Sequence, residues 1–127
     1  MLRYLLDTNV IIDFSKGRGQ AFTLVNGFVQ QGADIGICAI VVTEFFSGIA
    51  VPDRTVWHSF FANMNYWIID RAIAERAGDY RYTFARQGRQ LGVADTLIAA
   101  VAYMESATVV TRNVNDFPMS DISILIP

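Results

Sequence analysis

Four acidic residues stand inside or beside apolar stretches of the sequence, where an ionised carboxylate is costly. They are Asp7, Glu44, Asp95 and Asp116, hereafter the acidic quartet. A buried charge must be paired, must bind a metal ion, or must be neutralised through a shifted pKa. Arg112 is the one basic residue close in sequence, whereas a shared divalent cation satisfies all four carboxylates. The pattern therefore points to metal-dependent chemistry.

The ligand types indicate which metal this would be. Oxygen ligands without paired histidine or cysteine favour Mg²⁺, with Mn²⁺ as a substitute, over zinc. Four carboxylates can serve two such ions, which lie roughly 3.5–4 Å apart in phosphodiester-cleaving sites. One ion would lower the pKa of the attacking water and the other would stabilise the leaving oxygen, so no nucleophilic side chain is required.

Each aspartate also has a simpler explanation when it is taken alone. Asp7 can cap a helix after a strand, Asp95 can favour a helix dipole from the first turn, and Asp116 can form a turn. Glu44 has no capping role, because we expect it to be buried in mid-helix. Taken together and in this order, the four residues favour a metal site.

The secondary-structure pattern places these residues. We expect strands at residues 3–6, 34–37, 66–69, 108–111 and 122–126, and helices at 8–14, 21–31, 39–47, 52–64, 71–87 and 94–104. This alternation predicts an α/β fold with a mainly parallel central sheet between layers of helices. Ligands bind beyond the carboxyl ends of such strands, so Asp7, Asp95 and Asp116 should meet at one rim. We interpret Asp13, beyond them on the first helix, as a solvated helix end.

Composition sets further limits. A chain of 127 residues predicts a single domain over 1–127, and its 53% apolar content is a weak indication of a partner or a second copy. Because the apolar runs are too short to span a membrane and Asp7 interrupts the first, no membrane contact and no export signal are expected. The single cysteine, Cys38, suits a reducing cytoplasm and is interpreted as a small buried residue.

The net charge of −2 argues at first against a nucleic-acid ligand, but the basic residues are not evenly spread. Arginines gather between Arg71 and Arg89, and Lys16-Gly17-Arg18 forms a second small basic site. A solvated helix face is the simpler explanation of the arginine segment. If RNA binds, the candidate contacts are Lys16, Arg18, Arg86, Arg89 and Arg112.

Four motifs carry a family resemblance. The segments are Leu5-Leu6-Asp7-Thr8-Asn9-Val10-Ile11-Ile12, Thr43-Glu44-Phe45-Phe46-Ser47-Gly48, Val93 to Ala102 around Asp95, and Val110-Thr111-Arg112-Asn113-Val114-Asn115-Asp116-Phe117. In this order they resemble the motifs of PIN-domain ribonucleases, particularly the VapC-like toxins of toxin–antitoxin pairs. Each motif alone is weak to moderate evidence, whereas all four in this order are specific. Cys38 and Val41 depart from the hydroxyl residues common before the glutamate helix, and Cys38 should cap that helix poorly.

The resemblance implies a three-layer α/β/α fold and Mg²⁺-dependent cleavage of RNA. It assigns the acidic quartet as catalytic and metal-binding residues, with Asp7 and Asp95 as direct ligands. Residues that orient the carboxylates or water would be Thr8, Asn9, Thr111 and Asn113. It also implies an antitoxin partner and a homodimer.

Three alternatives remain open at this stage. A PIN-like nuclease of RNA processing would share the chemistry without being a toxin. An aspartate-based phosphatase could use Asp7 as nucleophile, although Asn9 stands where that chemistry generally needs a second aspartate. A binding module that kept the fold without catalysis is the third alternative, and an intact acidic quartet argues against it.

Overall fold

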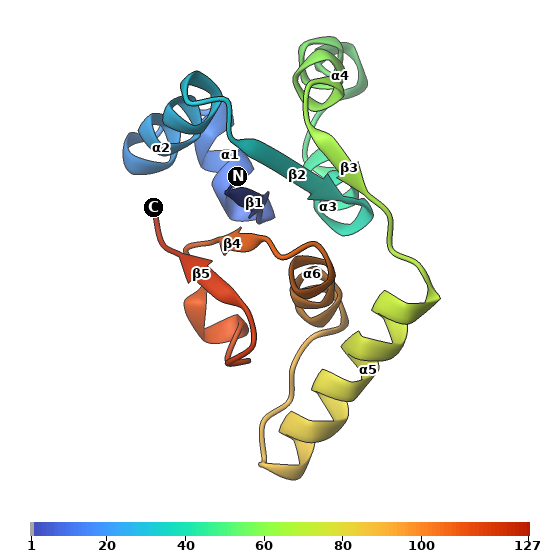
Figure 1. Ribbon diagram of the computed structural model, residues 1–127. Coiled ribbons are helices and arrows are strands. Elements are labelled where there is room, and N and C mark those ends of the chain that lie inside the picture. The colour runs from blue at the N-terminus through green and yellow to red at the C-terminus, as the bar shows by residue number, and fades with distance from the viewer. Residues whose placement is uncertain (1) are drawn as a thin grey trace.

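The structure is a computed structural model that describes residues 2–127, and a five-stranded parallel sheet forms its centre (Figure 1). The strands are β1 (Arg3–Leu6), β2 (Asp34–Cys38), β3 (Asn65–Trp67), β4 (Thr108–Val110) and β5 (Ser123–Leu125). Their order across the sheet is β3-β2-β1-β4-β5, and each neighbouring pair is parallel. The predicted sheet is therefore confirmed, and it is parallel throughout.

Helices cover both faces of the sheet and complete the predicted three-layer α/β/α arrangement. They are α1 (Thr8–Ser15), α2 (Gly19–Gln30), α3 (Ala39–Ser47), α4 (Thr55–Ala62), α5 (Arg71–Arg86) and α6 (Val93–Met104). Figure 1 shows α1 and α2 on one side of the sheet, and α5 and α6 on the other. Among residues 2–127, no helix has both the length and the apolar character that crossing a bilayer requires.

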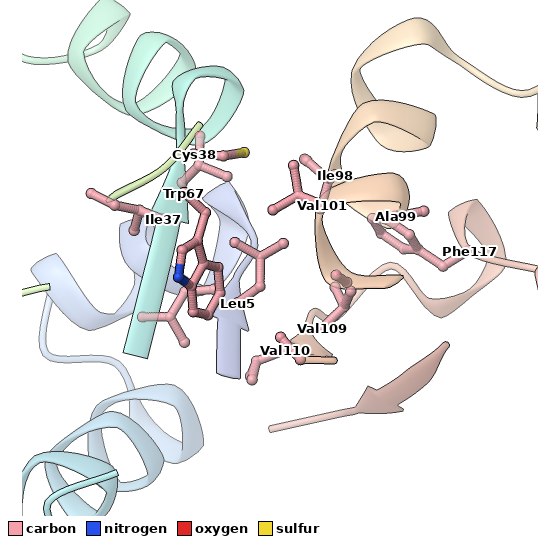
Figure 2. Packing of buried hydrophobic residues seen from close by; sticks show 14 of the residues in the cluster. Leu5, Ile37, Cys38, Trp67, Ile98, Ala99, Val101, Val109, Val110 and Phe117 are labelled. Carbon is pink, nitrogen blue, oxygen red and sulfur yellow. The ribbon is translucent and has the colours of Figure 1, made fainter. Parts of the chain in front are cut away.

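The apolar runs of the central strands form the core. Leu5 of β1 and Val109 and Val110 of β4 are completely buried, and Figure 2 shows Leu5 pointing toward Ile98 and Val101 of α6, with Val110 on the other side of the sheet. Parallel strands are covered on both faces, which is why these strands read as continuous apolar runs rather than as alternating ones.

The chain changes direction across the sheet next to β1. It runs outward from β1 through β2 to β3, and then returns through α5 and α6 to β4 on the other side of β1. The carboxyl ends of β1 and β4 are adjacent there, and the Asp7 amide donates to the Val110 carbonyl over 2.9 Å. Such a reversal opens a crevice at the carboxyl edge of the sheet, where ligands commonly bind.

The helix predicted over residues 52–64 begins later than expected. Instead of a single helix over 52–64, a short 3₁₀ turn (Val51–Asp53) precedes α4, which begins at Thr55. Arg54 separates the two, and its guanidinium donates to the carbonyls of Phe46 and Ile49. These side-chain bonds tie the turn back to the end of α3, a contact that helix propensity alone does not indicate.

Candidate active site

Asp7 lies at the junction of β1 and α1 and is 6% exposed. It caps α1, as expected for a lone Asp, because its Oδ1 accepts from the Thr8 amide over 2.8 Å. Its Oδ2 accepts from Thr111 Oγ1 over 2.8 Å and from Asn9 Nδ2 over 3.0 Å. Burial raises the pKa of Asp7, while these three hydrogen bonds oppose the increase and the charge of Glu44 adds to it. Both oxygens of the carboxylate are thus fixed in orientation.

Thr111 joins the two central strands at this point. It follows β4 and is completely buried, and its Oγ1 also accepts from Asn9 Nδ2 and from the Asn113 amide over 3.2 and 3.0 Å. Of the four predicted orienting residues, Thr8, Asn9 and Thr111 therefore contact carboxylates of the acidic quartet directly. Asn113 contacts the acidic quartet only indirectly, because its backbone N–H donates to Thr111 Oγ1.

Glu44 projects from α3 toward the start of α1. Its Oε1 accepts from Thr8 Oγ1 over 2.7 Å, which brings the two helices together at the rim. The side chain is exposed, so the expectation that Glu44 is buried in mid-helix was wrong. Its neighbour Phe45 takes the buried position at 2% exposure, because each residue of a helix is rotated by about 100° from the last.

Asp95 and Asp116 complete the acidic quartet. Asp95 is half-buried in the first turn of α6, and Asp116 is exposed in a 3₁₀ turn (Val114–Asp116) after β4. The pKa of Asp95 is raised to about 6, first by burial and then by the charges of Asp116, Asp7 and Glu44. The four carboxylates, which come from four separate elements, therefore share one electrostatic environment.

This environment is strongly acidic. None of the ion pairs recorded for residues 2–127 involves a member of the acidic quartet. Within the same residues, no three side chains of His, Cys, Asp or Glu stand as close together as the ligands of one metal ion. The acidic quartet is thus grouped electrostatically without forming a ready-made ligand shell.

Asp13 was assigned wrongly as a solvated helix end. It is 7% exposed, and its Oδ2 lies 2.7 Å from Arg112 Nε. Its Oδ1 lies 3.5 Å from Arg18 Nη1. Sequence reasoning missed this residue because Arg112 is distant in the chain, and the one available signal was an acid within an otherwise apolar helix.

The other candidate RNA contacts have three different environments. Arg86 stacks over the Tyr82 ring at 4.0 Å, Arg89 donates to the Asn115 carbonyl, and Lys16 is exposed at the end of α1. The arginine-rich segment is largely the solvated face of α5, as its exposed Arg71–Glu75 pair illustrates.

The family model described as PIN domain matches residues 4–119. The chain belongs to the PIN-domain family. The match contains every member of the acidic quartet and runs from within β1 to beyond the end of β4, and the observed three-layer fold agrees with it.

Individual relatives belong to one group within this family. Ribonuclease VapC19 of Mycobacterium tuberculosis is 27% identical over 115 residues, which cover 91% of this chain and 92% of the relative. The tRNA(fMet)-specific endonuclease VapC of Shigella flexneri is 29% identical over 122 residues, covering 92% and 91%. The DNA-bound VapBC structure from Salmonella typhimurium has a TM-score of 0.84 and 26% identity, and the match covers 99% of this chain and 98% of that one.

Proposed function

We propose that this protein is a Mg²⁺-dependent endoribonuclease that acts through Asp7, Glu44, Asp95 and Asp116, and that it is the toxin of a toxin–antitoxin pair. The observation that carries the proposal is the mutual influence of these four carboxylates near the carboxyl ends of β1 and β4. Membership of the PIN-domain family and the nuclease names of the VapC relatives support the same activity.

The residues present fit a hard divalent cation. The donor set consists of carboxylate oxygens, and among residues 2–127 no ion pair neutralises them. Asp7 and Asp95 would hold the cation directly, with Glu44 and Asp116 acting through water or beside a second ion. When bound, Mg²⁺ would lower the pKa of a water molecule and stabilise negative charge on the phosphate.

The protein's own contribution is orientation. Thr111, Asn9 and the Thr8 amide hold the Asp7 carboxylate in one position, and the Thr8 hydroxyl holds Glu44. Asp95, with its pKa of about 6, carries a proton on part of the molecules near neutral pH. A cation at the rim would favour release of that proton, because it offsets the repulsion among the carboxylates.

The bonds to Asp7 also bear on the phosphatase alternative. Aspartate-based phosphatase chemistry generally needs a second acid two positions after the nucleophile, and Asn9 stands at that position. Asn9 donates its amide to Asp7 and cannot serve as a general acid. These contacts favour an orienting and metal-binding role over covalent catalysis.

The decisive experiment is cleavage of a labelled RNA by the purified chain with Mg²⁺, with Mn²⁺ and with EDTA. We expect cleavage with either metal, and loss of cleavage in Asp7→Asn and in Asp95→Asn while urea unfolding remains cooperative. Asp79→Asn, an exposed carboxylate on the outer part of α5, is the matched control and should cleave normally. Activity that survives both substitutions in the acidic quartet would refute the proposal.

The toxin assignment has a separate test. We expect expression of the chain to arrest growth, expression of Asp95→Asn to be harmless, and co-expression of an adjacent antitoxin gene to restore growth. Growth that continues despite active nuclease would instead support the PIN-domain nuclease of RNA processing. The exposed apolar side chains Val29, Val51, Val56 and Ile68 offer surface for the antitoxin and for a second copy in the proposed homodimer.

A further inference from the structure

Two arginines from different elements converge on one buried carboxylate. The Asp13 side chain is 10% exposed and lies on α1, while Arg18 precedes α2 and Arg112 follows β4. Arg112 Nε is 2.7 Å from Asp13 Oδ2, and Arg18 Nη1 is 3.5 Å from Asp13 Oδ1. Asp13 therefore holds together two cationic groups that would otherwise repel each other.

Most of the hydrogen-bonding capacity of this pair faces solvent. The side chains of Arg18 and Arg112 are 62% and 54% exposed, although the carboxylate between them is buried. A guanidinium has five N–H donors, and the contact of Arg112 with Asp13 is made by Nε rather than by its two terminal nitrogens. Two guanidinium groups and one carboxylate leave one net positive charge. Forked donors with positive charge match the oxygens of a phosphodiester.

The pair lies beside the acidic quartet. The backbone N–H of Arg112 donates to Asn9 Oδ1 over 3.0 Å, and the amide of the same Asn9 donates to Asp7. Two hydrogen bonds thus connect the backbone of Arg112 to the Asp7 carboxylate. An RNA approaching four carboxylates is repelled by them, so a neighbouring cationic site would be needed to hold its backbone.

We propose that Arg18 and Arg112, gathered by Asp13, form a binding subsite for one stretch of the RNA phosphodiester backbone next to the acidic quartet. The proposal rests on the proposed ribonuclease function, which it deepens by assigning the substrate-holding residues. Asp13 acts as a positioning residue that keeps the two guanidinium groups in place when RNA is absent. The remaining candidates, Lys16, Arg86 and Arg89, do not share this arrangement.

The test is the salt dependence of RNA binding by the full-length protein. A short fluorescein-labelled 2′-O-methyl RNA of mixed sequence is titrated by anisotropy in EDTA at several KCl concentrations. Each single-stranded phosphate contact contributes about 0.7 to the slope of log affinity against log salt, so Arg18→Gln/Arg112→Gln should lower the slope by about 1.4. In cleavage assays, the same double variant should raise KM by a larger factor than it lowers kcat.

Two further variants distinguish the effect of losing positive charge from the effect of damaging the fold. Arg71→Gln makes the same charge change per residue on α5, which begins on the far side of the molecule from the α1–α2 junction (Figure 1), and should keep the wild-type slope. Arg18→Lys/Arg112→Lys keeps both charges and should also retain it. A slope that falls equally in the Lys and Gln double variants would show damage to the fold and overturn the proposal.

The remaining outcomes distinguish this subsite from the nuclease function. If the wild type cleaves RNA and the Gln double variant binds RNA with an unchanged slope, the subsite is wrong and the nuclease stands. If the slope falls as expected but the wild type never cleaves RNA, the phosphate-binding site is supported and the nuclease is refuted.

Discussion

Replacing Asp95 with Asn should make the metal-free protein more stable near neutral pH, even though it removes a proposed metal ligand. The pKa of Asp95 is raised from 3.8 to about 6, first by burial and then by Asp116, Asp7 and Glu44. The unfolded chain has the lower pKa, so between these values the folded state binds the proton more tightly. The stability that protonated Asp95 contributes to the folded state is fully present below about pH 4. It is lost as the pH rises through about 6.

The size of the pKa shift determines how much the free energy of unfolding should change in Asp95→Asn. The two values differ by about two units, and each unit corresponds to about 1.4 kcal/mol, so ionised Asp95 lowers the free energy of unfolding by at most about 3 kcal/mol. Asp95 is half-buried, and solvent screens part of the effect, so we expect about 1–2 kcal/mol. Asn has nearly the same shape and does not ionise. Asp95→Asn should gain this amount near neutral pH, and the gain should shrink toward pH 4.

The assay is urea unfolding in EDTA, followed through the fluorescence of Trp57 and Trp67 over a series of pH values. Asp79→Asn, the exposed control on α5, should change the free energy of unfolding by less than about 0.5 kcal/mol throughout. If Asp95→Asn is less stable than the wild type near neutral pH, or if its advantage does not depend on pH, the electrostatic reasoning about the acidic quartet is refuted.

Three further predictions concern single side chains. Thr111→Val keeps the shape but removes the hydroxyl that donates to Asp7, so RNA cleavage should fall about 10–100-fold, and Thr111→Ser should restore it in the same assay. Asp13→Asn should lower the urea-derived free energy of unfolding by about 1 kcal/mol, because it loses two ion pairs but leaves its partners in contact with solvent. Gly36→Ala places a Cβ against the Trp67 ring and should cost about 1–3 kcal/mol in thermal unfolding, and an unchanged Tm would contradict the packing described for β2 and β3.

Much of the fold could be predicted because local pattern and tertiary environment agree. Leu5 and Leu6 in β1 and Val109 and Val110 in β4 are continuous apolar runs, and the structure buries them fully as central parallel strands. The start of α4 could not be predicted, because it depends on the bonds from Arg54 to carbonyls at the end of α3.

In the site too, the sequence predicts features that depend on neighbouring residues better than features that depend on residues far apart in the chain. The carboxyl ends of neighbouring strands meet, which is the ground for predicting Asp7 and Asp116 at one rim, and the charges of both act on Asp95 of α6. Apolar neighbours in sequence misled the prediction for Glu44, because helical rotation gives the buried position to Phe45 instead. The burial of Asp13 depends on Arg112, and a single sequence gives no sign that these residues meet.

The bond between Thr111 and Asp7 spans 104 positions of the chain, and this has a consequence for synthesis on the ribosome. Asp7 is translated early, but the hydroxyl that fixes it arrives only with β4, and Asp116 arrives later still. A nascent chain that lacks residues 108–116 has neither the central β1–β4 pairing nor the full acidic quartet. Under the proposed function, the growing polypeptide would therefore become able to cleave RNA only when nearly all of the family-matched region has been made.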